Sequence, residues 1–260
     1  MHAVTRFIDQ SGPVSRSRML PLVHVTSTSN FRKIIESGRL EPRPCKVLKH
    51  EILYCSYGDI VFRPSGDQAY WDSDPPVAMV ISPDVLRQDY TFYPVDTGAI
   101  DAGRLSSFPS NLRASFKERL RITDWNGHRL RQWIKAAFGG NDQYRYRKTT
   151  DWKPSTPDEV SAVQQICAGI SVGALPDHLK DDLHVISQVE CHLSRPIDLA
   201  DHVTHLVLPS DGDGHQNLLA PTHAKRFGIS YYRGHPVRGN LPQDLVSIVR
   251  HQIASNKGIE

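Results

Sequence analysis

The chain has 260 residues and a formal net charge of +3 at pH 7, with 39% hydrophobic and 23% charged residues. This composition is typical of a soluble globular protein with one substantial core or two smaller ones. No apolar run approaches the roughly twenty residues of a membrane span, and the N-terminus lacks the apolar stretch of a secretory signal. The four cysteines are scattered without a Cys-x-x-Cys pair, which favours reduced thiols and a cytoplasmic location.

Residues 1–20 mix Ser, Arg, Gly and Pro without periodicity, so we expect a loose N-terminal arm followed by a single domain over residues 21–260. Residues 22–27 predict a strand with His24 and Thr26 on one face and two valines on the other. The valines would face a core, and His24 and Thr26 would look into a shared space as a hydrogen-bonding pair.

A short helix is predicted next. Polar side chains from Ser27 to Asn30 suit its N-cap, and Gly38 supplies a left-handed end. The helix has only about two turns, so packing must stabilise it. Residues 51–57 predict a second strand, and residues 75–83 hold a short apolar strand that we expect at the centre of a sheet.

Residues 90–93 predict one more strand, and the loop after it carries no assigned role. Residues 104–153 are strongly basic, and we expect a basic helical insertion there. Its helices would expose three basic residues: Arg129, Arg131 and Lys135. Four aromatic residues are interleaved with the cations: Trp125, Trp133, Tyr144 and Tyr146. Cations hold phosphates while rings stack on bases, which indicates single-stranded nucleic acid as a partner. The alternative is a solvated helix face whose aromatics belong to the core.

Thr156, Pro157 and Glu159 fit a capping box that predicts the start of another helix. Residues 185–193 then predict a strand that sends Gln188, Glu190 and His192 to one face. Polar groups on an otherwise apolar strand are costly if they are buried without partners, so this face indicates a cleft.

The last part of the chain predicts strands at residues 206–209 and 229–232 and a closing amphipathic helix around residues 245–253. The acidic run at residues 211–215 lacks the remaining ligands of a calcium loop, so we interpret it as a surface turn. His202 and His205 lie three residues apart, but no zinc motif accompanies them, and we expect no metal site.

The order and spacing of four motifs resemble the NAD-binding half of ADP-ribosyltransferases. The motifs are a His-x-Thr strand at His24, a helix ending in Gly-x-Leu at Gly38, a Leu-Tyr strand at Tyr54 and the late glutamate Glu190. The resemblance spans about residues 20–200 and is nearest to the branch named for His, Tyr and Glu. That branch includes diphtheria-type toxins, poly(ADP-ribose) polymerases and bacterial DarT-type enzymes that modify DNA, so the resemblance implies a toxin of bacterial defence.

The resemblance implies a role for each matching residue. His24 would bind a ribose hydroxyl of NAD, the backbone of Val25 would grip the carboxamide, and Thr26 would assist. Glu190 would bind the reacting ribose and polarise the acceptor. Gln188, two residues earlier, would join the NAD-binding set, although Gln-x-Glu is more typical of the branch that opens with arginine.

A tyrosine of the second strand would stack on the nicotinamide ring. Tyr54 and Tyr57 are three residues apart, so a regular strand turns them to opposite faces. Because Tyr57 shares its face with the more apolar residues, we expect it to pack inward and Tyr54 to face the ligand. Gly58 leaves Tyr57 as the alternative, since it could end the strand early and turn that ring back.

The sequence therefore predicts an α+β fold: a split, mostly antiparallel sheet around an NAD cleft, with the basic segment 104–153 inserted. The implied function is mono-ADP-ribosyl transfer from NAD to a macromolecule, with nucleic acid preferred to protein, through an oxocarbenium-like transition state. The alternatives are NAD hydrolysis, a nucleic-acid-binding module with an inactive cleft, and RNA 2′-phosphotransfer, whose phosphate-site arginines the sequence does not locate.

Overall fold

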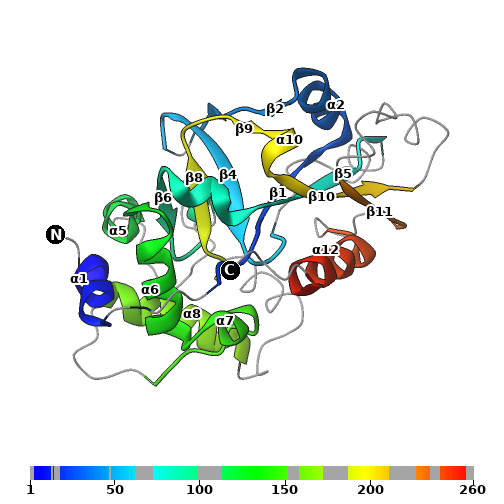
Figure 1. Ribbon diagram of the computed structural model, residues 1–260. Helices are drawn as coiled ribbons and strands as arrows, with labels where there is room; N and C mark the ends of the chain where they lie inside the picture. The colour runs from blue at the N-terminus through cyan, green and yellow to red at the C-terminus, as the bar shows by residue number, and fades with distance from the viewer. Residues whose placement is uncertain are drawn as a thin grey trace. The chain divides into compact units, whose positions relative to one another are not determined.

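The computed structural model describes residues 3–12, 14, 18–46, 48–61, 73–98, 113–151, 158–171, 187–210, 227–234 and 241–255. The chain is mixed α+β, with mostly antiparallel strands and several helices (Figure 1). It divides into two compact units. Unit 1 comprises Met1–Met19, Pro44–Glu51 and Leu86–Leu193; unit 2 comprises Leu20–Arg43, Ile52–Val85 and Ser194–Glu260. None of the described helices has the length and apolarity needed to cross a membrane.

Unit 2 is built on five strands in the order β11-β10-β5-β1-β4. In chain order these are β1 (Leu22–Ser27), β4 (Glu51–Tyr57), β5 (Pro76–Ile81), β10 (Val203–Pro209) and β11 (Gly228–Tyr232). Neighbouring strands are antiparallel except β10 and β11, which are parallel. Every residue of β5 is buried, which confirms the predicted central strand.

Helix α12 (Gln243–Ser255) packs against β5, β10 and β11 (Figure 1). Val23 and Val25 of β1 lie in the same buried cluster as three α12 residues: Leu245, Val249 and Ile253. The helix residues recur at helical spacing and the valines alternate along the strand, so each element presents one apolar stripe to the other. The inward valine face predicted for residues 22–27 is confirmed.

Helix α2 (Thr28–Ser37) begins directly after β1. The Ser27 side chain caps it by accepting a hydrogen bond from the backbone N of Asn30, and Gly38 ends it at a φ of 69°. Phe31 and Ile34 are buried, so packing stabilises this short helix. Unit 2 also contains three shorter elements: β2 (Arg39–Leu40), β9 (Ile197–Asp198) and α10 (Leu199–His202). β2 and β9 pair antiparallel.

Unit 1 contains the strands β8-β6-β7, paired antiparallel in that order. These are β6 (Asp89–Tyr93), β7 (Ile122–Trp125) and β8 (Glu190–Leu193). Its helices are α1 (Ala3–Gln10), α5 (Arg113–Leu120), α6 (His128–Phe138), α7 (Asn141–Arg145) and α8 (Asp158–Ser171). Helix α1 contacts α5, α6 and α8, and α5 also contacts α8 (Figure 1). Two short elements, β3 (Arg43–Pro44) and the 3-10 helix η1 (Pro83–Arg87), include residues of both units.

Two sequence-based predictions need correction. The expected loose arm contains α1, because Val4 and Ile8 form one apolar stripe and are fully buried. The strand expected over residues 185–193 starts only at Glu190, after a turn at Ser187. Other predicted features lie outside the described residues: Val185, Ile186, the caps Thr156 and Pro157, and the acidic run 211–215.

The N-terminus of α6 is fixed by a buried carboxylate. Gly127 precedes the helix at a φ of 66° and has no side chain to cap it. Asp124 of β7 supplies the cap: its two oxygens accept hydrogen bonds of 3.0 Å from the backbone N atoms of Arg129 and Leu130. Oδ2 also accepts a 2.6 Å bond from the Tyr90 hydroxyl. These bonds hold the basic helix in a fixed orientation on β7.

Candidate functional site

Unit 2 contains a cavity of about 610 Å³ lined by β1, α2, β2 and the start of β4. This volume is within the range of small-molecule sites. All six residues of β1 pair with β5, whereas the register with β4 covers only Leu22 and Val23. The cavity therefore forms where β1 diverges from β4, beginning at His24.

His24 lies in the wall of this cavity, and its ring is held by the backbone. Its Nδ1 is 2.7 Å from the carbonyl oxygen of Tyr54. A carbonyl can only accept, so Nδ1 carries the hydrogen and the neutral ring keeps Nε2 as an acceptor. Burial lowers the pKa of His24, against the opposing effect of the Tyr54 bond, and the charge of Arg43 lowers it further. A neutral His24 can thus accept a hydrogen bond from a ligand hydroxyl.

The lowered pKa makes a prediction about stability. As the pH falls through about 6.5, the ordinary histidine pKa, the unfolded chain takes up a proton at residue 24 that the native ring does not. Stability should therefore fall by up to about 1.4 kcal/mol per pH unit between that pH and the lower native pKa. In the His24→Asn variant, the free energy of unfolding, measured with urea at several pH values, should depend less steeply on pH in this range. His205, whose pKa burial also lowers, is present in both proteins, so equal slopes would contradict the prediction.

Cations that the sequence analysis did not single out also line the cavity. They are Lys33, Arg39 and Arg43; the lining contains one acidic residue, Glu41. Arg43 Nη1 donates a 3.2 Å hydrogen bond to Asn30 Oδ1 in the first turn of α2. A cavity with this surplus of positive charge suits an anionic ligand such as a phosphate. The only signal in the sequence was the spacing of Asn30 and Lys33 along one helix face.

The two candidate tyrosines occupy different environments. Tyr54 lines the cavity together with Val25 and Thr26. Tyr57 is fully buried, and its hydroxyl accepts a 3.1 Å hydrogen bond from the backbone N of Leu20. Gly58 follows at a φ of 65°, where a Cβ would lie 2.4 Å from Leu20 Cδ1. The tight turn at Gly58 leaves Tyr57 in the core and out of the cavity wall.

Glu190 belongs to a second cluster, within unit 1. Thr97 donates two hydrogen bonds to Glu190 Oε2, one from its backbone N at 2.9 Å and one from Oγ1 at 2.8 Å. His192 Nε2 lies 3.3 Å from Glu190 Oε1, so the predicted shared face of Glu190 and His192 is confirmed. The Tyr93 ring lies 4.9 Å from the His192 ring. Burial raises the pKa of Tyr93 to about 12, which keeps the phenol neutral.

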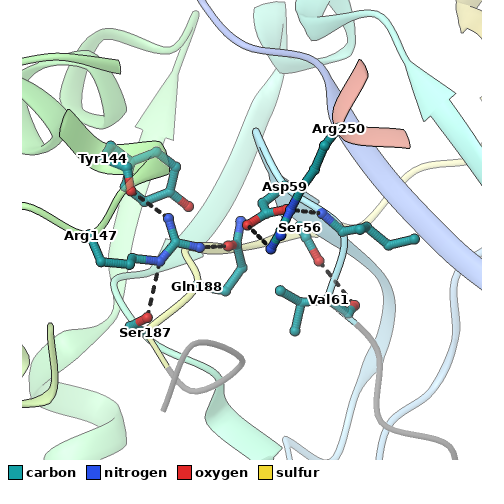
Figure 2. Close-up of polar contacts among 9 residues, drawn as sticks. Ser56, Asp59, Val61, Tyr144, Arg147, Ser187, Gln188 and Arg250 are labelled. Carbon is teal, nitrogen blue, oxygen red and sulfur yellow. Dashed lines mark hydrogen bonds and ion pairs between the residues drawn. The ribbon is translucent and has the colours of Figure 1, made fainter. Parts of the chain in front are cut away.

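Gln188 does not belong to this cluster. Its side chain is buried, and its Oε1 accepts a hydrogen bond from Arg147 Nη2 (Figure 2). Arg147 is itself fully buried and donates to Ser187 Oγ at 3.0 Å and to the Tyr144 carbonyl at 2.6 Å. Gln188 therefore helps to satisfy a buried guanidinium. The structure places Gln188 beside Arg147 and away from Glu190, and its NAD-binding role stays a prediction.

The basic segment is only partly as predicted. Trp133 and Tyr144 are fully buried and belong to the core, so they cannot stack on bases. Trp125 and Tyr146 are 61% and 72% exposed. The side chains of the three cations differ in their contacts. Arg129 Nη1 donates to the Thr123 carbonyl, Arg131 Nη2 donates to the Asn126 carbonyl, and Lys135 is exposed. The exposed rings of Trp125 and Tyr146 and the exposed Lys135 therefore remain from the predicted set, together with two arginines that also bond backbone carbonyls.

Metal and thiol chemistry find little support in the described residues. Across these parts of the chain, no three His, Cys, Asp or Glu side chains are grouped so that they could hold a metal ion. Burial raises the pKa of the Cys55 and Cys167 thiols, that of Cys167 to about 12. Neither thiol is therefore ionised near neutral pH, which is the form needed for nucleophilic attack.

Comparison with models of known protein families, with curated proteins and with solved structures finds no match for this chain. The resemblance carried by His24, Tyr54 and Glu190 thus has no support from a wider likeness in sequence or fold. The features that indicate a function are the cavity in unit 2 and the carboxylate cluster in unit 1.

Proposed function

We propose that the protein is an NAD-dependent mono-ADP-ribosyltransferase with an ADP-ribosyltransferase-like fold. The observation that supports this best is the neutral His24, held by the Tyr54 carbonyl with Nε2 as an acceptor, in a cavity with a cationic lining. Such a cavity suits a molecule that carries both ribose hydroxyls and phosphates, as NAD does. The divergence of β1 from β4 also fits the split sheet expected for this fold.

The cavity offers partners for the nicotinamide, a ribose and the diphosphate of NAD. His24 Nε2 accepts a hydrogen bond from a ribose hydroxyl, and the Tyr54 ring stacks on the nicotinamide. The backbone of Val25, which lies beyond the register with β4, binds the carboxamide, and Thr26 assists. The diphosphate is bound by cations of the cavity lining: Lys33, Arg39 and Arg43.

Glu190 supplies the chemistry. When the bond between ribose C1′ and the nicotinamide nitrogen breaks, nicotinamide leaves with the bonding electron pair and positive charge develops on the sugar. A fixed carboxylate stabilises that charge. The acceptor then forms a bond to C1′, and its proton passes to the carboxylate or to water.

Nicotinamide release from NAD by the purified protein tests this function. Release that depends on Glu190 and is weakened by substitutions at His24 supports it. A wild-type protein that neither binds NAD nor releases nicotinamide with any acceptor contradicts it.

Single-stranded nucleic acid is the proposed acceptor. The support is that the exposed rings of Trp125 and Tyr146 belong to the same segment as Arg129, Arg131 and Lys135. Exposed rings stack on unpaired bases of any sequence, and the cations bind the phosphates. Protein is the second acceptor, and water would make the protein an NAD hydrolase.

Replacing Arg129, Arg131 and Lys135 together by Ala is expected to weaken binding of single-stranded DNA and to flatten its salt dependence. Each lost phosphate contact lowers the slope of log affinity against log salt by about 0.7 units. Nicotinamide release without an acceptor should barely change. The matched control removes three exposed cations elsewhere, Arg32, Lys46 and Arg195, and should leave the slope as in the wild type. An unchanged slope in the first variant would mean that this surface is only a solvated helix face.

A second function is favoured by one observation. RNA 2′-phosphotransfer needs arginines around a phosphate, and the cavity is lined by Arg39 and Arg43 together with His24. NAD-dependent loss of a 2′-phosphate from RNA, without stable label on the RNA, would favour this reaction over ADP-ribosyl transfer.

A further inference from the structure

The contact between Thr97 and Glu190 joins residues 93 positions apart in the chain. Tyr93, the last residue of β6, pairs with Glu190, the first residue of β8. The four residues after Tyr93 bring Thr97 back to the Glu190 side chain, and Thr97 is fully buried. A buried residue that follows a paired strand this closely has few alternative positions, so its two donors are fixed before any ligand arrives.

The two oxygens of Glu190 have different surroundings. Each carboxylate oxygen has about two lone pairs. The backbone N–H and the hydroxyl of Thr97 occupy both of them on Oε2, at 2.9 and 2.8 Å. Oε1 faces His192 Nε2 at 3.3 Å and retains capacity for a further donor. The Glu190 side chain is 15% exposed, so a ligand can reach it.

We infer that Thr97 is a positioning residue for ADP-ribosyl transfer: it holds Oε2 so that Oε1 is the oxygen presented to the reacting ribose. This inference rests on the proposed function of Glu190. Thr97 does not touch the substrate in this role. It prevents rotation of the carboxylate, so that the negative charge already stands in place when the sugar becomes positive.

The substitution that isolates the hydroxyl is Thr97→Val, which has nearly the same shape and keeps the backbone donor. We expect kcat for nicotinamide release to fall about tenfold, as for a lost hydrogen bond to a charged group. The KM for NAD should change by less than about twofold, because the bond affects the carboxylate and not NAD binding. Thr97→Ser restores the hydroxyl and should restore kcat.

The matched variants separate this role from a purely structural one. Thr97→Ala provides the same test if the Val side chain disturbs folding, and melting temperatures establish that each variant is folded. A structural role would reduce stability and affect kcat and KM without rescue by Ser. An active wild type whose Thr97→Val and Thr97→Ala variants keep normal kcat overturns this inference alone. A wild type that does not cleave NAD overturns it together with the proposed function.

Discussion

Replacing Glu190 by Gln is expected to lower kcat for nicotinamide release by about a hundredfold or more while NAD still binds. Glutamine has nearly the same shape, and its amide oxygen can still accept the two Thr97 hydrogen bonds. What it lacks is the negative charge that stabilises the oxocarbenium-like sugar. The loss should therefore appear in kcat, and the NAD dissociation constant should change by less than about twofold.

Steady-state nicotinamide release and calorimetric titration with NAD measure the two quantities. The control is Glu36→Gln, which removes an exposed carboxylate from α2 and should behave as the wild type. Near-normal turnover by Glu190→Gln would assign the chemistry to another group, and His192, whose Nε2 lies 3.3 Å from Glu190, is the next residue to replace.

Replacing Tyr57 by Ala is expected to reduce the free energy of unfolding by about 3 to 5 kcal/mol, the usual cost of deleting a buried aromatic ring. Tyr57 is fully buried, and its hydroxyl bonds the backbone of Leu20. Tyr54→Ala should instead leave the fold stable and lose about 1 to 3 kcal/mol of NAD binding, if stacking on a base is the right guide. Stacking needs only a ring, so Tyr54→Phe should keep most of the affinity.

Urea unfolding and NAD titration of the same three variants distinguish the two tyrosines. A Tyr57→Ala protein that remains stable but fails to bind NAD would reverse their roles. A Tyr54→Ala protein with normal NAD affinity would remove the stacking role from this strand.

Local sequence patterns were sufficient to predict a helix or strand where that element packs against a single core. The apolar run of β5, the stripe of α12 and the Ser27 and Gly38 ends of α2 were all predicted, because each depends on residues within one element. Helix α1 was missed because it has only eight residues and its burial depends on distant helices. Strand β7 was missed because only Ile122 and Asp124 of its four residues are buried.

In the candidate site, too, residues placed by a local pattern were predicted, and residues placed by contacts distant in the sequence were not. His24, Thr26 and Tyr54 could be assigned to one face by strand alternation, and the structure places all three at the cavity. Thr97 could not be assigned, because its contact with Glu190 depends on the pairing of β6 with β8. The strand face predicted for Gln188 was wrong for a related reason: strand alternation was extended through Ser187 and Gln188, where a turn and the buried Arg147 decide the orientation.

The most direct test of ADP-ribosyl transfer is incubation of the protein with NAD labelled in its adenylate part and, separately, with pools of single-stranded DNA, RNA and protein. The wild type should place label on a macromolecule, with nucleic acid favoured, and release nicotinamide in equal amount. Glu190→Gln should do neither at a comparable rate. Free ADP-ribose as the only product would make the protein an NAD hydrolase. Intact NAD in every pool, with a folded wild-type protein, would contradict the proposed function.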